Sequence, residues 1–88
     1  MRYIAFWEMD MEDMAEVVEK MKTRKRKLKT LLPPHGIGGQ PWGFVVFESD
    51  DEQELVDYVA HYSPELRLEI HPIWESSKTI AAWEAANK

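Results

Sequence analysis

The sequence predicts an α+β domain in which strand-forming and helix-forming segments follow one another as β-α-β-β-α-β before a final short helix. Three observations predict this class. Short runs of β-branched and aromatic residues alternate with longer segments whose apolar residues recur at helical spacing. Acidic residues, which favour helix starts, follow two of the strand-forming runs. The chain of 88 residues is also short enough to make residues 1–88 one domain with a modest core.

The first half of the chain predicts a strand, a long helix and a turn-rich segment. Residues 2–9 carry β-formers on both parities, and Asp10 can cap a helix that follows. The pair Pro33–Pro34 ends this helix. Between these points the apolar residues recur at helical spacing: Met14, Val17, Val18, Met21, Leu28, Leu31 and Leu32. The glycines of residues 35–42 leave room only for a short edge strand around Ile37.

The second half predicts a strand, a helix, a strand and a helix. These segments cover residues 43–49, residues 51–62, residues 66–74 and a short stretch that begins at Ser76 or Ser77 as its cap. Ser49 or Asp50 can cap the first of these helices, and Pro64 ends it. The complete order is the split βαβ, or ferredoxin-like, pattern, in which both main helices cover one face of an antiparallel sheet.

The other face of this sheet, here called the open face, has no helix to cover it. The run Phe44–Phe47 is apolar on both parities, and strands of this kind are usually buried on both sides. We expect Ile4, Phe6, Val45 and Phe47 to lie on the open face, where they would form an association surface. The simplest cover is the same face of a second copy, so the sequence predicts a two-fold homodimer that pairs as a dimeric α/β barrel.

Four tryptophans are many for this length. Trp7 is predicted in the core. Trp74 and Trp83 are predicted to pack the C-terminal helix, either on its own sheet or on a partner chain, because aromatic residues supply much of a small interface.

Three segments of this pattern resemble a known family. YIAFWEM at the start, GFVVFESDD with the helix ELVDYVAHY, and LEIHPIWES near the end are similar to the family described as domain of unknown function 3303. The resemblance covers most of the chain, and its motifs are mainly structural. It implies a place among the dimeric α/β-barrel relatives of the ferredoxin-like fold, which include cofactor-free monooxygenases, isomerases, decarboxylases, stress-response barrels and ligand-sensing modules. It therefore implies a fold and an inter-sheet cleft, and no particular reaction.

Ionisable residues of the first and last strands are the candidate catalytic groups. If Glu8 lies opposite Arg67 in an antiparallel pair, Phe6 lies opposite Glu69. Glu8, Glu69 and His71 then share the open face, where a histidine and a glutamate can act as general base and orienting group. The structural alternative is a cross-strand pair of Glu8 with Arg67, with the other two residues at the rim of the dimer interface.

The segment GIGGQPWG is either a turn or a loop that closes over a ligand. It lacks the lysine of a phosphate-binding loop and does not lie between a strand and the start of a helix. A turn or edge strand is the simpler interpretation, because glycine supplies positive φ. If the cleft does hold a ligand, its expected contacts are Phe6, His35, Gln40, Trp42 and Phe47.

Charge and histidine spacing argue against nucleic-acid and metal sites. Seven of the eleven basic residues lie between Lys20 and Lys29, and the rest of the chain is strongly acidic. This basic run suits the end of a helix and lacks the interleaved aromatic residues that stack on bases, so we expect no nucleic-acid partner. The three histidines lack the spacing of a helical metal site and the chain has no cysteine, so we expect neither metal nor cofactor.

We also expect a cytoplasmic protein without a membrane partner. No apolar run approaches the roughly 20 residues that span a bilayer, and the opening segment becomes charged too early for a signal peptide.

Three functions remain open from the sequence. The first is a homodimeric module that binds or senses a small apolar or aromatic molecule in the cleft. The second is a monooxygenase- or isomerase-like enzyme without a cofactor that uses His71 with Glu8 or Glu69. The third is a purely structural assembly protein whose cleft is filled by Phe6 and Phe47.

Overall fold

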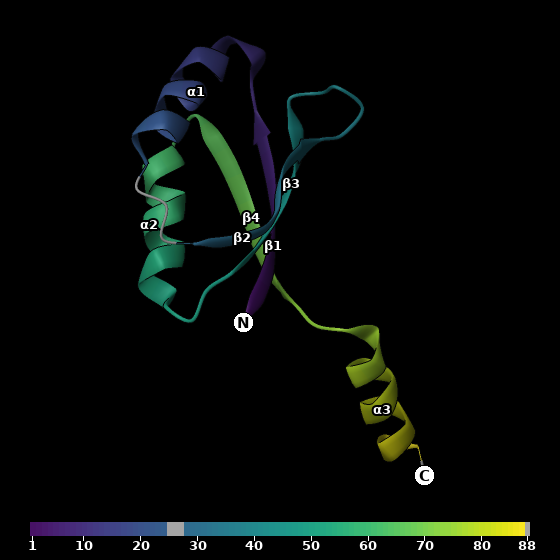
Figure 1. The fold of residues 1–88 in the computed structure, drawn as a ribbon. Coiled ribbons are helices and arrows are strands. Elements are labelled where there is room, and N and C mark those ends of the chain that lie inside the picture. Colours follow the sequence, from purple (N-terminus) through teal and green to yellow (C-terminus); the bar gives the residue numbers. More distant parts are fainter. Residues whose placement is uncertain (25–27, 88) are drawn as a thin grey trace.

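The computed structural model describes residues 1–24 and 28–87, which contain an antiparallel four-stranded sheet with helices on one face (Figure 1). The elements in chain order are β1 (Arg2–Met9), the 3-10 helix η1 (Met11–Asp13), α1 (Met14–Thr23), β2 (Lys29–Gly36), β3 (Trp42–Glu48), α2 (Glu52–Tyr62), β4 (Leu66–Ile73) and α3 (Ser76–Ala86). The strand order β2-β3-β1-β4 is consistent with the predicted ferredoxin-like arrangement, and the α+β class is confirmed.

The register between the first and last strands is the one assumed for the candidate catalytic residues. Glu8 is the partner of Arg67, and Phe6 is the partner of Glu69 in the antiparallel pair of β1 and β4. On the other side of β1, Phe6 lies opposite Phe44 of β3. Because directly opposite residues share a face, these cross-strand rows decide which side chains lie together on each side of the sheet.

The helix-covered face of the sheet forms the core. Ala5, Val45 and Phe47 are almost fully buried there. The ring of Phe47 lies 5.6 Å from that of Tyr58 on α2, measured between ring centroids. Val17 is the buried residue of α1, so each of these two helices contributes to one apolar layer above β1 and β3.

The predicted composition of the open face is half wrong. Ile4 and Phe6 lie on it, but Val45 and Phe47 lie on the opposite face, beneath α1 and α2. The residues of β3 that accompany Ile4 and Phe6 are Val46 and Phe44. The run Phe44–Phe47 is apolar on both parities, so only its pairing with β1 decides which parity meets the helices.

The predicted long helix is also wrong. Helix α1 ends at Thr23, and Leu31, Leu32, Pro33 and Pro34 belong to the edge strand β2. An edge strand tolerates proline because one of its sides needs no hydrogen bonds, and the pairing of β2 with β3 is irregular between Leu32 and His35. The edge strand thus lies earlier in the chain than predicted, and the segment around Ile37 is a turn. Residues 25–27 of the basic run lie outside the described residues.

The remaining elements agree with the prediction to within about two residues, although their caps differ. Asp51 caps α2, because its Oδ1 atom accepts a hydrogen bond from the Gln53 amide at 2.9 Å. Ser49 instead donates its hydroxyl to Glu54. Helix α3 follows Glu75, which makes no side-chain cap, so the prediction that a serine caps this helix is wrong.

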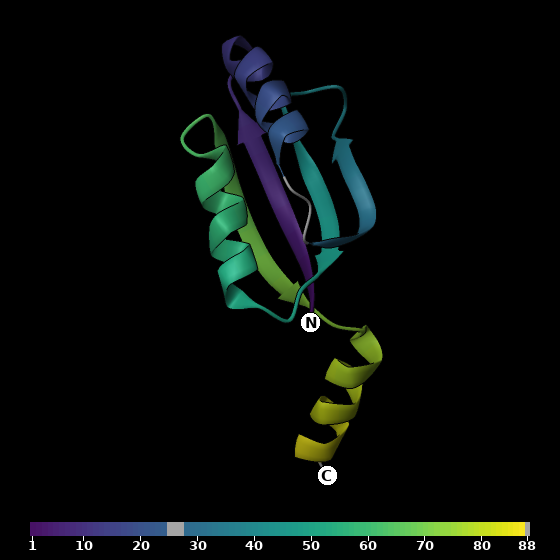
Figure 2. The ribbon, with the colours of Figure 1, turned by 60° about the vertical axis from the view of Figure 1, so that its left-hand side comes forward.

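Helix α3 extends beyond the end of the sheet (Figure 2). None of its residues is buried. In Figure 1, α1 and α2 lie to the left of the sheet and α3 lies below it and to the right, on the side of the open face.

Candidate functional site

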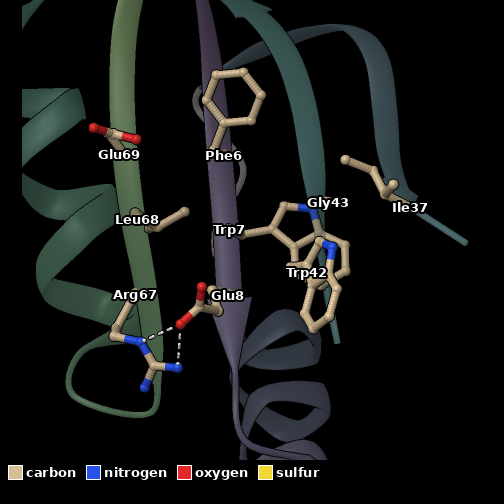
Figure 3. A pocket seen from close by; sticks show the side chains of 9 residues that line it. All are labelled: Phe6, Trp7, Glu8, Ile37, Trp42, Gly43, Arg67, Leu68 and Glu69. Carbon is tan, nitrogen blue, oxygen red and sulfur yellow. Dashed lines mark hydrogen bonds and ion pairs between the residues drawn. The ribbon is translucent and has the colours of Figure 1, made fainter. Parts of the chain in front are cut away.

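A groove of about 520 Å³ lies on the open face, near the turn between β2 and β3 (Figure 3). Its side chains on the open face are Phe6, Glu8, Trp42, Arg67 and Glu69, and the turn contributes Ile37. Phe6 and Trp42, on the two middle strands, are 41% and 42% exposed. The groove therefore combines exposed aromatic walls with a few charged groups.

An ion pair marks the polar end of this groove. Arg67 donates from Nη2 and Nε to Oε1 of Glu8, over 2.7 Å and 3.1 Å, and Asp10 lies 3.7 Å from the same Nη2 atom. The hydrogen bonds to Glu8 are the main reason why the pKa of Arg67 lies above its ordinary value. Glu8 therefore forms the cross-strand pair with Arg67 that was the structural alternative to a catalytic role. Both side chains remain about half exposed, so the pair can also orient a polar group of a ligand.

The floor of the groove depends on Gly43. A Cβ atom at this position would lie 1.8 Å from the carbonyl oxygen of His35 and 2.6 Å from the indole of Trp7. Glycine therefore lets β2 and the Trp7 ring approach β3 closely. The Nε1 atom of Trp7 is buried and has no hydrogen-bond partner among the described residues.

The family described as Domain of unknown function (DUF3303) matches residues 1–87, which include every element from β1 to α3. The chain belongs to the DUF3303 family. No curated protein matches it. The family match therefore includes the residues of the groove and α3, and it assigns no function to them.

The DUF3303 chain brings two of the three candidate catalytic residues together. Nε2 of His71 lies 3.5 Å from Oε1 of Glu69, and both side chains are at least half exposed. Glu8 does not join them, because it lies opposite Arg67 while His71 lies opposite Ile4, four residues away along β1. The pair of His71 with Glu69 also borders Phe6, whose ring centroid is 6.1 Å from that of the histidine.

The predicted ligand contacts are divided between the groove and other places. Phe6 and Trp42 line the groove. His35 stacks on Phe44 with 5.7 Å between ring centroids, and Gln40 is exposed in the turn, so neither lines the groove. Phe47 is 1% exposed on the helix-covered face and cannot line a cleft on the open face.

The turn itself is tight. Gly38 and Gly39 have positive φ values of 62° and 72°, and the Gln40 amide donates to the carbonyl of Ile37. This geometry agrees with the interpretation of GIGGQPWG as a turn. Sequence reasoning missed Ile37 and Arg67 as groove residues. The predicted register already placed Arg67 beside Glu8, and that was the available signal.

The described residues contain no group of three or more acidic or histidine side chains that could hold a metal ion. The helices within the described ranges are all too short or too polar to cross a membrane.

Proposed function

We propose that this DUF3303 chain is a homodimeric binding module, whose two open faces meet and whose groove holds a small apolar or aromatic molecule. The observation that carries the proposal is the apolar centre of the open face, which no helix of the described structure covers. This centre consists of Ile4, Phe6, Phe44 and Val46 on the two middle strands.

The surroundings of this apolar centre favour a protein partner of the same kind. Arg2, Glu48, Glu69 and His71 lie on the same face around it, and an apolar centre with a charged rim is typical of a specific interface. A two-fold axis pairs the same surface with itself, so both copies bury their apolar centres at once. A dimer of this kind would place the chain among the dimeric α/β barrels.

The size and lining of the groove favour the proposed small-molecule ligand. Its volume falls within the roughly 300–1,000 Å³ that is usual for small-molecule sites. In one chain the groove is open to solvent, and a second sheet over the open face would enclose it. Phe6 and Trp42 offer faces for an aromatic body, while the ion pair of Glu8 with Arg67 offers polar atoms at one end.

The dimer is tested by native mass spectrometry and size-exclusion chromatography. Val46→Glu places a charge in the apolar centre and is expected to give a folded monomer. Val56→Glu is the matched control, because Val56 is 59% exposed on α2, away from the open face. The wild type and the control are expected to be dimers. A monomeric wild type would contradict the proposal.

Ligand binding is tested with N-phenyl-1-naphthylamine, a neutral aromatic probe whose fluorescence rises in apolar sites. The dimer is expected to bind it saturably, and Trp42→Ala is expected to weaken binding about tenfold, because an aromatic wall is lost. Val56→Ala is the control for a general loss of exposed apolar surface. Equal binding by Trp42→Ala and the wild type would place the probe elsewhere and contradict the groove as the site.

An enzymatic function is the second candidate, because the His71 and Glu69 pair lies on the same face as the groove. Here the imidazole would accept a proton from a bound phenol or related acid, with Glu69 orienting the ring. Oxygen uptake or isomerisation with a panel of phenolic compounds would be abolished by His71→Gln and retained by His61→Gln. Turnover that survives His71→Gln would exclude this residue as the base.

A further inference from the structure

Helix α3 is the least covered helix of the described chain. All of its residues are exposed, and Ile80 and Trp83 are 54% and 64% exposed. Only Lys78 and Glu84 are charged among its eleven residues. Helix α1, which packs on the sheet, has four charged residues in ten. Of the three α-helices, α3 thus has the fewest charged side chains, yet its apolar residues pack on no surface of its own described chain.

A helix of this length needs a packing surface. Isolated helices shorter than about 12–15 residues are marginal in water, and most helical stability in proteins comes from packing of an apolar side. Ile80 and Trp83 are three positions apart and therefore lie on the same side of α3. This side is the part of α3 that a partner would cover.

The start of α3 directs it away from its own sheet. Nε1 of Trp74 donates to Oγ1 of Thr79 at 3.0 Å, and the Lys78 amide donates to the carbonyl of Glu75 at 3.0 Å. These bonds fasten the junction that follows β4. Figure 1 shows that α3 then passes beyond the sheet on the side of the open face, where the proposed second copy would lie.

The area of the open face gives an independent reason for a contact between α3 and that copy. Four strands about 4.8 Å apart, each roughly eight residues long at about 3.3 Å per residue, give a footprint of about 500 Å². A stable interface needs about 800 Å² of accessible surface from each partner, and a face with a footprint of this size reaches that area only through its protruding side chains. A fully buried tryptophan contributes about 150–250 Å², and more than half of Trp74, Trp83 and Ile80 is still exposed, so these side chains would enlarge the contact appreciably.

We infer that α3 is an arm that packs on a second copy of this chain, with Ile80 and Trp83 as its contact side. This inference rests on the proposed dimer and extends it. In a two-fold dimer each chain gives its arm and receives the other, so the contact is made twice. The arms would then lie at the borders of the paired sheets and complete the enclosure of the space between them.

Paramagnetic relaxation in mixed dimers tests this inference, and the absence of cysteine from the chain makes site-specific labelling simple. An unlabelled chain carries Ala86→Cys with a nitroxide at the end of α3, and its partner is the ¹⁵N-labelled wild type without a nitroxide. Only contacts between two chains can broaden the ¹⁵N signals. Ala60→Cys, at an exposed position on α2, is the control for labelling far from the open face.

Broadening of wild-type signals by the Ala86 label, and much weaker broadening by the Ala60 label, would support the exchanged arm. Mixed dimers without broadening from the Ala86 label would overturn it while leaving the dimer intact, and α3 would then be free or packed on its own chain. If size-exclusion chromatography shows that no dimers form, the proposed function fails, and the arm fails with it.

A second measurement uses the affinity of the dimer. The double variant Ile80→Ala with Trp83→Ala is expected to weaken dimerisation at least about tenfold, because it removes the contact side of both arms. Val56→Ala is the matched control, since Val56 is similarly exposed but lies on α2. Equal dissociation constants for the double variant and the wild type, measured by analytical ultracentrifugation, would overturn the inference.

Discussion

At Gly43, three strands of the sheet approach one another closely. The carbonyl oxygen of His35 and the indole of Trp7 both lie within 3 Å of the position where any other residue would place its Cβ atom. The first of these contacts involves backbone, so no side-chain rotation relieves it. Gly43 is therefore required by the approach of β2 to β3, and the shape of the groove floor follows from it.

We predict that Gly43→Ala lowers the free energy of unfolding by about 3 kcal/mol or more, because β2 must move away from β3. Gly36→Ala is the matched control in the same hairpin. Its Cβ atom would meet only the carbonyl oxygen of Gln40, at 3.7 Å, so a change within about 1 kcal/mol is expected. Urea unfolding measures both. Similar losses in the two variants would contradict the close approach as the cause.

The ion pair between Lys20 and Glu65 connects α1 to the segment before β4. Lys20 donates to the carboxylate of Glu65 and to the carbonyl of Ser63. Both charged side chains are about one-fifth exposed, which makes the pair less open to solvent than the other ion pairs of the described residues. The hydrogen bond from Lys20 is the main cause that lowers the pKa of Glu65 below its ordinary value of 4.5.

The lowered pKa of Glu65 predicts the sign of a pH effect. A carboxyl group with a lowered folded-state pKa contributes stability above its unfolded pKa, and the contribution disappears as the pH falls through the folded value. Glu65→Gln should therefore be less stable than the wild type near pH 7, and the difference should shrink below pH 4.5. Glu19→Gln, in an exposed pair, is the control. A difference that does not depend on pH in urea titrations would contradict this assignment.

At the scale of the elements, β3 separates two groups of aromatic residues. Phe47 is packed between Tyr3 and Tyr58 on the helix-covered face, whereas Phe44 lies on the open face and stacks with His35. Neighbouring positions of one strand thus serve the core and the candidate interface. The apolar run could not show this division, because every residue in it suits burial.

We predict that Phe47→Ala costs about 3–5 kcal/mol of unfolding free energy, because it leaves a cavity in the core. Phe6→Ala is the comparison on the open face. It is expected to cost about 1 kcal/mol or less in dilute protein, where the chain is monomeric, and to weaken the dimer at high concentration. Chemical unfolding at two protein concentrations distinguishes the effects. Equal costs in dilute protein would contradict the assignment of the two faces.

The edge strand β2 shows where helical spacing misleads. Leu28, Leu31 and Leu32 continue the helical pattern of α1, yet Leu31 and Leu32 belong to a strand. Pairing with β3 and the packing of Leu28 in the core outweigh the local preference. Spacing alone shows that apolar residues recur with a helical period. Tertiary contacts decide whether the backbone forms a helix or a strand.

At the scale of the whole molecule, the described residues form one well-packed side, and the open face and α3 lack a cover. Both lie on the same side of the sheet (Figure 1). A monomer would leave Ile4, Phe6, Phe44 and Val46 without a partner element and would leave Trp83 in water. One second copy can cover both surfaces, and it would enclose the groove as well.

We predict that the melting temperature of the wild type rises by a few degrees when the protein concentration is raised about 100-fold, because association stabilises the folded state by mass action. The melting temperature of Val46→Glu should not change with concentration. Differential scanning calorimetry at the two concentrations measures this. A wild type whose melting temperature is independent of concentration would argue against a dimer coupled to folding.

The sequence by itself determined the features that depend on local pattern. These are the α+β class, β1, the strand β3 and helix α2 to within two residues, and the alternation of β4, and the assumed placement of Glu8 beside Arg67 agrees with the structure. Only the tertiary structure decided which parity of β3 meets the helices, where α1 gives way to β2, and that Phe6, Ile37 and Trp42 share a groove. The physical reason is the range of the interactions. Spacing and turn chemistry act between neighbours in sequence, whereas register and face depend on strands distant in the chain, and each shift of one residue moves every side chain to the other side.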